Sequence, residues 1–156
     1  MSRPPRIAGF EYKGLCRYLI TCCTHLRRPI FLDDEIASGT LAQFRLTAIE
    51  DRFAIVAYCV MPDHVHLLVE GSSVGSDLRR FVRIAKQRAA SWYSRAVGGR
   101  LWQAGYHDRV LRRDDDLRIV ARYVLENPIR AGLVTIATDY KHSGSDIWSI
   151  TDILSE

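Results

Sequence analysis

The sequence has no long hydrophobic run and no recognisable targeting segment. Its 156 residues contain no stretch of about 18 apolar residues, so no segment is expected to span a membrane. The first residues carry charge but lack the apolar stretch and the small-residue cleavage site of a secretory signal. These absences predict a cytoplasmic protein.

The sequence also has no C-x-x-C pair, which argues against a zinc ribbon and against a disulfide framework. The cysteines fall in strand-like segments, where we expect reduced thiols that behave as small buried hydrophobes. They are Cys16, Cys22, Cys23 and Cys59.

What is present is the composition of an ordinary globular domain, 47% hydrophobic and 26% charged. Its length predicts a single domain over 1–156, with the core over about 10–135 and a C-terminal tail over about 136–156. The 22 Lys and Arg residues outnumber the 18 Asp and Glu residues, giving a net charge of +4. This excess favours an anionic partner without requiring one.

Hydrophobic spacing predicts the order strand, helix, strand, strand, helix, strand, helix. Pro62 and Asp63 are turn residues, so the second and third strands are expected to form a hairpin. Pro128 disfavours helical geometry in the residue before it, so the last helix is expected to end near Asn127. The expected strands cover 15–23, 53–60, 64–69 and 106–112, and the expected helices cover about 34–50, 76–96 and 117–127.

This order is typical of an α+β, ferredoxin-like (RRM-like) fold. Such a fold has a four-stranded antiparallel sheet with helices on one face, to which this chain would add a C-terminal helix. The open face of such a sheet often binds single-stranded nucleic acid, although the fold alone does not establish that use.

Two histidines interrupt the aliphatic strand VMPDHVHLLV. Side chains alternate along a strand, so His64, His66 and Leu68 are expected on one face, with Val65 and Val69 on the other. The aliphatic set can face the helices, which leaves two imidazoles side by side and able to bind one cation. An arbitrary H-x-H pair is more often simply half exposed, so this signal is weak by itself.

A tyrosine and an asparagine four residues apart extend this pattern. Tyr123 and Asn127 share one face of the last predicted helix. If that face crosses the histidine strand, Asn127 offers an amide oxygen as a third ligand and Tyr123 a phenolic nucleophile. The alternative for Tyr123 is a half-buried helix aromatic without a chemical role, and the alternative for Asn127 is an ordinary residue at the end of a helix. Tyr93 and Tyr106 are rival nucleophiles, better explained as packing or substrate contacts.

Basic residues with an intervening aromatic form a candidate DNA-binding surface. Most lie on the predicted helix over 76–96, where a solvated charged face is the competing explanation. Trp102 can stack on an unpaired base or belong to the core, and His107 is a possible further metal ligand. The candidate DNA-binding residues are Arg79, Arg80, Arg83, Lys86, Arg88, Trp102, Arg109 and Arg112.

Three motifs together resemble a known family. VMPDHVHLLVE looks like the HUH motif (histidine, hydrophobic, histidine) of single-tyrosine, IS200-like transposases. LWQAGYHDRVLR, followed by YVLENPIRAGLV, resembles the REP-associated tyrosine transposase (RAYT) branch, and the likeness covers roughly residues 10–148. KHSGSDIW matches the family's C-terminal segment only loosely.

This resemblance implies an enzyme that cleaves and joins single-stranded DNA with hairpins, such as REP palindromes, at the nucleoid. It implies that His64, His66 and Asn127 hold Mg²⁺ or Mn²⁺ and that Tyr123 attacks the phosphodiester, forming a 5′-phosphotyrosine. A monomer or a homodimer is expected, with the tyrosine supplied by the same chain or by a partner. Two alternatives stay open: a non-catalytic hairpin-binding module, and a metal-dependent nuclease using activated water.

Overall fold

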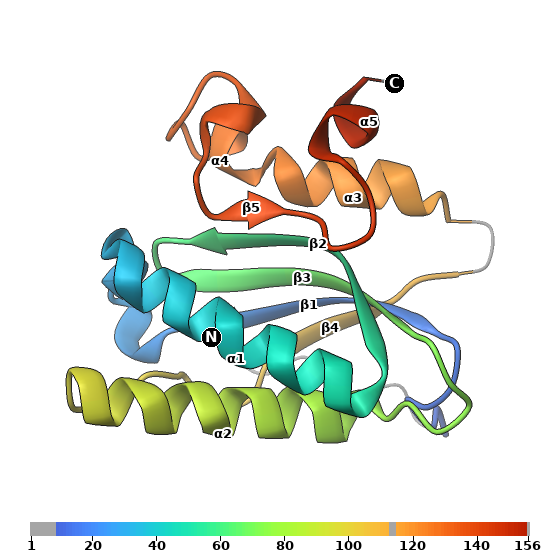
Figure 1. Ribbon diagram of the computed structural model, residues 1–156, viewed down its shortest axis with the longest axis horizontal. Helices are drawn as coiled ribbons and strands as arrows, with labels where there is room; N and C mark the ends of the chain where they lie inside the picture. Colours follow the sequence, from blue (N-terminus) through green and yellow to red (C-terminus); the bar gives the residue numbers. More distant parts are fainter. Residues whose placement is uncertain (1–8, 113–114, 156) are drawn as a thin grey trace.

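The fold is built on one antiparallel sheet of five strands in the order β4-β1-β3-β2-β5 (Figure 1). The computed structural model describes residues 9–112 and 115–155. β2 and β3 form the predicted hairpin, with Pro62 and Asp63 in its turn. The strands are β1 (Arg17–Cys23), β2 (Phe53–Met61), β3 (His64–Gly71), β4 (His107–Val110) and β5 (Ser143–Gly144).

Two long helices cover one face of the sheet (Figure 1). α1 (Asp34–Asp51) begins where the Asp33 carboxylate accepts hydrogen bonds from two backbone N–H groups, and α2 (Leu78–Ala96) is capped in the same way by Asp77. Between the helices and the sheet lies a core rich in aromatic residues, in which Phe81 contacts Phe44 and Phe53. The core on this face consists of buried apolar and aromatic side chains.

Three shorter helices lie on the opposite face (Figure 1). They are α3 (Leu117–Leu125), α4 (Asn127–Arg130) and α5 (Ile150–Leu154). A second, smaller core forms there, in which Val124 and Leu125 of α3 pack with Leu68 of β3 and Ile153 of α5. Among the described helices, none is long and apolar enough to cross a membrane.

The predicted element order is confirmed as far as α3, and the segment predicted as a tail adds β5 and α5 to the fold. The sheet has five strands and not four, because β5, in the segment predicted as a tail, pairs with the free edge of β2. The last predicted helix is two helices: α3 stops at Leu125, and α4 starts at Asn127. Pro128 lies in the first turn of α4, where its missing N–H costs no hydrogen bond.

The cysteines match their predicted state in most respects. All four are free thiols, and Cys22, Cys23 and Cys59 are buried, whereas Cys16 is only half-buried. Burial raises the pKa of the Cys22 and Cys59 thiols to about 12, so both stay protonated at neutral pH.

Candidate active site on the α3 face

The histidine strand divides its side chains between the two cores as predicted. Val65 and Val69 belong to the core under α1 and α2, and Leu68 belongs to the core under α3. His64 and His66 are both half-buried. By strand alternation they share the face of Leu68, so the imidazoles lie on the α3 side of the sheet.

The two imidazoles point their Nε2 atoms at one another, 3.0 Å apart. The other nitrogen of each ring, Nδ1, is called the outer nitrogen, and it has a different hydrogen-bond partner in each histidine. His64 Nδ1 lies 2.7 Å from Asp63 Oδ1, and His66 Nδ1 lies 2.9 Å from the hydroxyl of Thr21, the residue directly opposite it on β1. Arg27 in turn donates from Nε to Asp63 Oδ2 at 2.9 Å. Both rings are therefore fixed in position and in rotation.

Burial keeps both imidazoles neutral at neutral pH. It lowers the pKa of His66 to about 3, with smaller contributions from His64 and from the charge of Arg130. It also lowers the pKa of His64, although the hydrogen bond to Asp63 opposes this. Burial alone would raise the pKa of Asp63, but the hydrogen bonds with Arg27 and His64 outweigh it, and the net shift is downward. A carboxylate beside two neutral rings is the result.

Tyr123 lies near the end of α3 with its side chain exposed, at 52% of its full accessible surface. The Arg130 guanidinium stacks on its ring, 3.9 Å from the centroid. Arg130 also donates from Nη2 to the Tyr123 carbonyl at 2.5 Å. That carbonyl is one of the last four of α3, which a helix end leaves without intrahelical partners. Arg130 thus holds both the backbone and the ring of Tyr123.

The same arginine connects the tyrosine to the histidine strand. Its charge contributes to the lowered pKa of His66 and partly opposes the rise in the pKa of Cys59 that burial causes; these two residues pair across β2 and β3. The short helix α4 also contacts β2. The junction between α3 and α4 therefore lies over the part of the sheet that carries the imidazoles, with Asn127 as the first residue of α4.

The donor atoms on this face fit a divalent cation. Two cis ligand atoms of an octahedral cation, each about 2.1 Å from it, lie about 3.0 Å apart, which is the separation of the two Nε2 atoms. The buried Nδ2 of Asn127 has no hydrogen-bond partner among the described residues. Turning this amide so that its oxygen faces a cation would break no hydrogen bond of Nδ2 with the described residues.

No further histidine, cysteine or carboxylate side chain among the described residues completes a metal site with the two imidazoles. Within 9–112 and 115–155, no group of three or more His, Cys, Asp or Glu side chains is arranged to hold a metal ion. A cation site on this face therefore needs the amide of Asn127 beside the two imidazoles. Two imidazoles and one amide leave open positions for a substrate oxygen.

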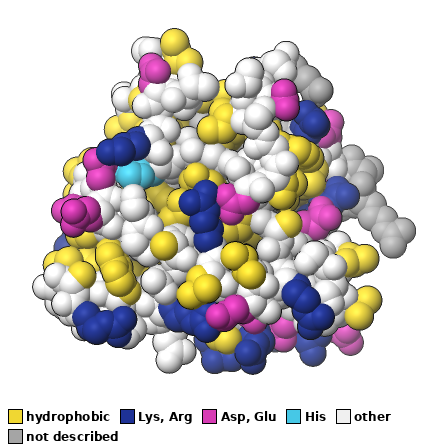
Figure 2. Space-filling model, in the orientation of Figure 1, with side chains coloured by type: hydrophobic (Ala, Val, Ile, Leu, Met, Phe, Trp, Pro, Cys, Tyr) yellow, Lys and Arg dark blue, Asp and Glu magenta, His cyan; other side chains and the backbone are white. Residues whose placement is uncertain are grey.

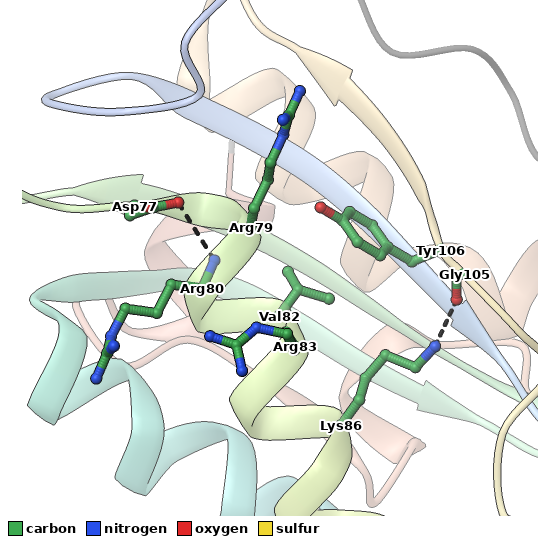
Figure 3. A pocket seen from close by; sticks show the side chains of 8 residues that line it. All are labelled: Asp77, Arg79, Arg80, Val82, Arg83, Lys86, Gly105 and Tyr106. Carbon is green, nitrogen blue, oxygen red and sulfur yellow. Dashed lines mark hydrogen bonds between the residues drawn. The ribbon is translucent and has the colours of Figure 1, made fainter.

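A second concave region lies on the other side of the molecule, along α2. Figure 2 shows Lys and Arg side chains gathered over this helix. Arg79, Arg80 and Arg83 fan out from α2 around a pocket of about 680 Å³, with Tyr106 on its far side (Figure 3). All three arginines are exposed. Within this pocket Arg80 lies 3.5 Å from the Asp51 carboxylate and Arg79 stacks on the Tyr12 ring. Three cations around one pocket can bind phosphate groups.

Three other predicted DNA-binding residues are less available because of their partners. Lys86 donates to the backbone carbonyls of Gln103 and Gly105 (Figure 3). Arg88 forms an ion pair with Glu50 at 2.6 Å. Trp102 is only 6% exposed and donates from Nε1 to the Lys86 carbonyl, so the core explanation fits it, and base stacking would require its ring to leave the core.

Of the two remaining predicted DNA-binding arginines, Arg109 shares a pocket with Tyr123, and Arg112 lines a different pocket. Arg109 and Tyr123 line a common pocket of about 400 Å³ between β4 and α3. Arg109 is 3.7 Å from the carboxylate of Asp115, and its side chain stays largely exposed. Arg112 is exposed and lines a separate pocket with Arg17.

The rival residues have other places. Tyr93 is buried in the core under α1 and α2, which confirms its expected packing role. Tyr106 lines the arginine pocket along α2. His107 is the β4 neighbour of Thr21, on the opposite side of Thr21 from His66. It does not join the two imidazoles.

Sequence reasoning did not identify Arg130 and Thr21 as residues of this site, nor the contacts by which Asp63 and Arg27 orient His64. Arg130 follows Tyr123 by seven residues, two helical turns, and that spacing was the available signal. Thr21 gave no signal, because its position beside His66 depends on the register between β1 and β3.

Residues 12–127 match the family described as transposase IS200 like. The chain belongs to this IS200-like transposase family. Membership implies an enzyme that cleaves and transposes DNA, and it confirms the family resemblance seen in the three motifs.

Named relatives point to one branch of these transposases. A Haemophilus influenzae protein whose name places it among REP-associated tyrosine transposases is 25% identical over 137 residues, covering 81% of this chain and 77% of that protein. A solved REP-associated tyrosine transposase bound to a REP hairpin shares the fold, with a TM-score of 0.74 and 23% identity, covering 92% of this chain and 82% of the other. A Deinococcus radiodurans R1 crystal structure, described as a transposase, has a TM-score of 0.54 and 27% identity, covering 80% and 97%.

Proposed function

We propose that this IS200-like transposase cleaves hairpin-bearing single-stranded DNA and joins the ends to new strands through a covalent bond to Tyr123. The observation that carries the proposal is the arrangement on the α3 face. Two fixed imidazoles face each other at 3.0 Å, and Arg130, whose charge reaches His66, stacks on an exposed tyrosine. The structural relative bound to a REP hairpin supports the substrate class.

Tyr123 acts as the nucleophile in this proposal. Its phenolic oxygen attacks phosphorus in line, the bond from phosphorus to the 3′ oxygen breaks, and a bond from the tyrosine oxygen to phosphorus forms. Tyr123 gives up its proton and the departing 3′ oxygen gains one. The product is a 5′-phosphotyrosine and a free 3′-hydroxyl. Because the phosphodiester is exchanged and not hydrolysed, a second 3′-hydroxyl can reverse the step and join another strand.

The surrounding side chains position the phosphate and balance its charge. A divalent cation, Mg²⁺ or Mn²⁺, held by His64, His66 and Asn127, would stabilise the negative charge that gathers on the phosphate oxygens. Asp63 keeps His64 oriented, and Arg130 holds the Tyr123 ring and adds a positive charge beside it. Tyr123 lies over the sheet of its own chain, which favours supply of the nucleophile in cis, in a monomer or a homodimer.

The hairpin is proposed to bind through the arginines that the structure leaves exposed. Arg79, Arg80 and Arg83 surround the pocket along α2, and Arg109 shares a pocket with Tyr123. Contacts to phosphates position DNA without reading its sequence. These arginines would therefore set affinity, while the α3 face carries out the chemistry.

A nuclease using activated water is the second candidate, because the imidazole pair fits a cation whether or not Tyr123 reacts. It would leave free 5′ ends, and a non-catalytic hairpin-binding module would leave the DNA intact. A covalent adduct distinguishes the proposed function from both alternatives.

The test is to incubate the protein with hairpin-bearing single-stranded DNA labelled at its 3′ end, with Mg²⁺ or Mn²⁺, and to separate the products in SDS. The 3′ label is needed because the fragment with the new 5′ end stays on the tyrosine. We expect a labelled protein band with the unsubstituted chain and with the matched control Tyr93→Phe, a tyrosine of the core under α1 and α2, and none with Tyr123→Phe. An equal band from Tyr123→Phe would show that the nucleophile is another residue.

A further inference from the structure

Among the residues that the structure describes, the hydroxyl of Thr21 is the hydrogen-bond partner of His66 Nδ1. Thr21 lies on β1, directly opposite His66 on β3, with its Oγ1 2.9 Å from His66 Nδ1. His64 is held differently, by the carboxylate of Asp63, which accepts hydrogen bonds only. The two imidazoles thus have outer partners of different chemistry: one fixed acceptor, and one group that can either donate or accept.

The proton positions of the metal-free site follow from these contacts. With both rings neutral, each imidazole carries one N–H. His64 must carry it on Nδ1, because Asp63 only accepts, so His64 Nε2 has a free lone pair. The 3.0 Å contact between the Nε2 atoms then requires the proton on His66 Nε2. His66 Nδ1 is left as an acceptor, and the Thr21 hydroxyl donates to it.

Cation binding needs a different arrangement at His66 alone. The lone pairs of both Nε2 atoms must face the cation. The Nε2 lone pair of His64 is already free in the metal-free site. His66 must carry its proton on Nδ1 instead, where the proton needs an acceptor. Rotation of the Thr21 hydroxyl turns the same oxygen from donor to acceptor, so His66 can change tautomer without losing its outer hydrogen bond.

We infer that Thr21 is a positioning residue that holds His66 in both tautomers, and so allows one rigid imidazole pair to be stable without a cation and competent to bind one. This inference rests on the cation site of the proposed function. It predicts that a hydroxyl at position 21 matters and that its methyl group does not. Outer-shell partners of metal-bound histidines typically contribute about 10–100-fold in metal affinity.

Three variants of the full-length chain separate this role from general packing. Thr21→Val keeps the shape and the β-branched side chain but removes the hydroxyl. Thr21→Ser restores the hydroxyl without the methyl group. Thr40→Val is the matched control, because the buried Thr40 hydroxyl on α1 has no hydrogen-bond partner among the described residues.

The experiment measures Mn²⁺ affinity by electron paramagnetic resonance and the His66 tautomer by ¹⁵N NMR of the metal-free protein. We expect Thr21→Val to weaken Mn²⁺ binding about 10–100-fold and to change the ¹⁵N signals of His66. Thr21→Ser and Thr40→Val should bind like the unsubstituted chain. In that chain, metal-free His66 should carry its proton on Nε2.

Two results would overturn the inference, and they are distinguishable. If Thr21→Val binds Mn²⁺ as tightly as Thr40→Val and leaves the His66 signals unchanged, Thr21 does not position His66, while the proposed function stands. If the unsubstituted chain binds no Mn²⁺ at all, the cation part of the proposed function fails together with the inference.

Discussion

Helices cover both faces of the sheet, but the side chains beneath them differ between the two faces. Under α1 and α2, aromatic and aliphatic side chains form a large buried core, in which Phe81 contacts Phe44 and Phe53. Under α3 the core is smaller, and beside it the imidazoles of His64 and His66 are only half-buried. One strand, β3, contributes to both faces.

The difference shows how a short domain can combine a large apolar core on one face with hydrogen-bonded polar groups on the other. The closed face supplies most of the apolar burial, so the other face can hold polar groups fixed by hydrogen bonds. Burying an imidazole in an apolar core costs free energy. In a metal-binding site, a hydrogen bond to the outer nitrogen of a half-buried imidazole instead fixes the orientation of the ring. Substitutions on the two faces should therefore have separable effects, on stability and on chemistry.

The largest expected effect is on the closed face. Phe81→Ala removes a fully buried ring and should lower the free energy of unfolding by about 3–5 kcal/mol. Tyr123→Phe, at an exposed position, should change it by less than about 0.5 kcal/mol. Chemical denaturation of both variants measures the contrast. If Tyr123→Phe lowered the free energy of unfolding as much as Phe81→Ala, the proposed separation of stability and chemistry between the two faces would be wrong.

A smaller effect is expected at Arg130 on the site face. Arg130→Ala removes the guanidinium from the Tyr123 ring, and misplacing the nucleophile should slow adduct formation about 10²-fold. Arg130→Lys keeps the charge without the planar stack, so an intermediate rate is expected. Single-turnover adduct assays give the rates.

Arg122→Ala is the matched control for that experiment. Arg122 lies on α3 next to Tyr123 in sequence, but it pairs with Glu126 at 2.8 Å. We expect it to form adduct at nearly the unsubstituted rate. Equal loss in both variants would mean that the helix end, and not the guanidinium on the ring, is what the reaction requires.

The smallest effect concerns hairpin affinity along α2. Arg83→Ala should weaken hairpin binding at every sequence and reduce the slope of log affinity against log salt by about one. Arg88→Ala should leave the slope nearly unchanged, because Arg88 is paired with Glu50. Fluorescence anisotropy over a salt series measures both. A larger change with Arg88→Ala would mean that its ion pair opens to bind DNA.

Much of this arrangement could be predicted from the sequence because it depends on local periodicity. Alternation along VMPDHVHLLV assigned His64 and His66 to one face, and the apolar spacing located the long helices correctly. Asp33 and Asp77, whose side chains cap α1 and α2, belong to a residue type that favours the N-cap position of a helix.

The missing parts depend on contacts between distant segments. β5 is two residues long and is defined only by its pairing with β2, so no pattern of its own predicts it. The pairing of Thr21 with His66 joins residues 45 positions apart. The last long helix ends at Leu125, close to its predicted end near Asn127, but the short helix α4 that follows, with Pro128 in its first turn, was not predicted. The burial of Trp102 likewise follows from α1 and α2 packing, not from its neighbours in sequence.

The most direct test of the cation and tyrosine site is anomalous diffraction from crystals of the full-length protein soaked in Mn²⁺. The account predicts one Mn²⁺ peak in contact with His64 Nε2, His66 Nε2 and the Asn127 amide oxygen, on the sheet face that carries Tyr123. A Mn²⁺ peak that contacts neither imidazole, or an imidazole pair with no peak at saturating Mn²⁺, would contradict it.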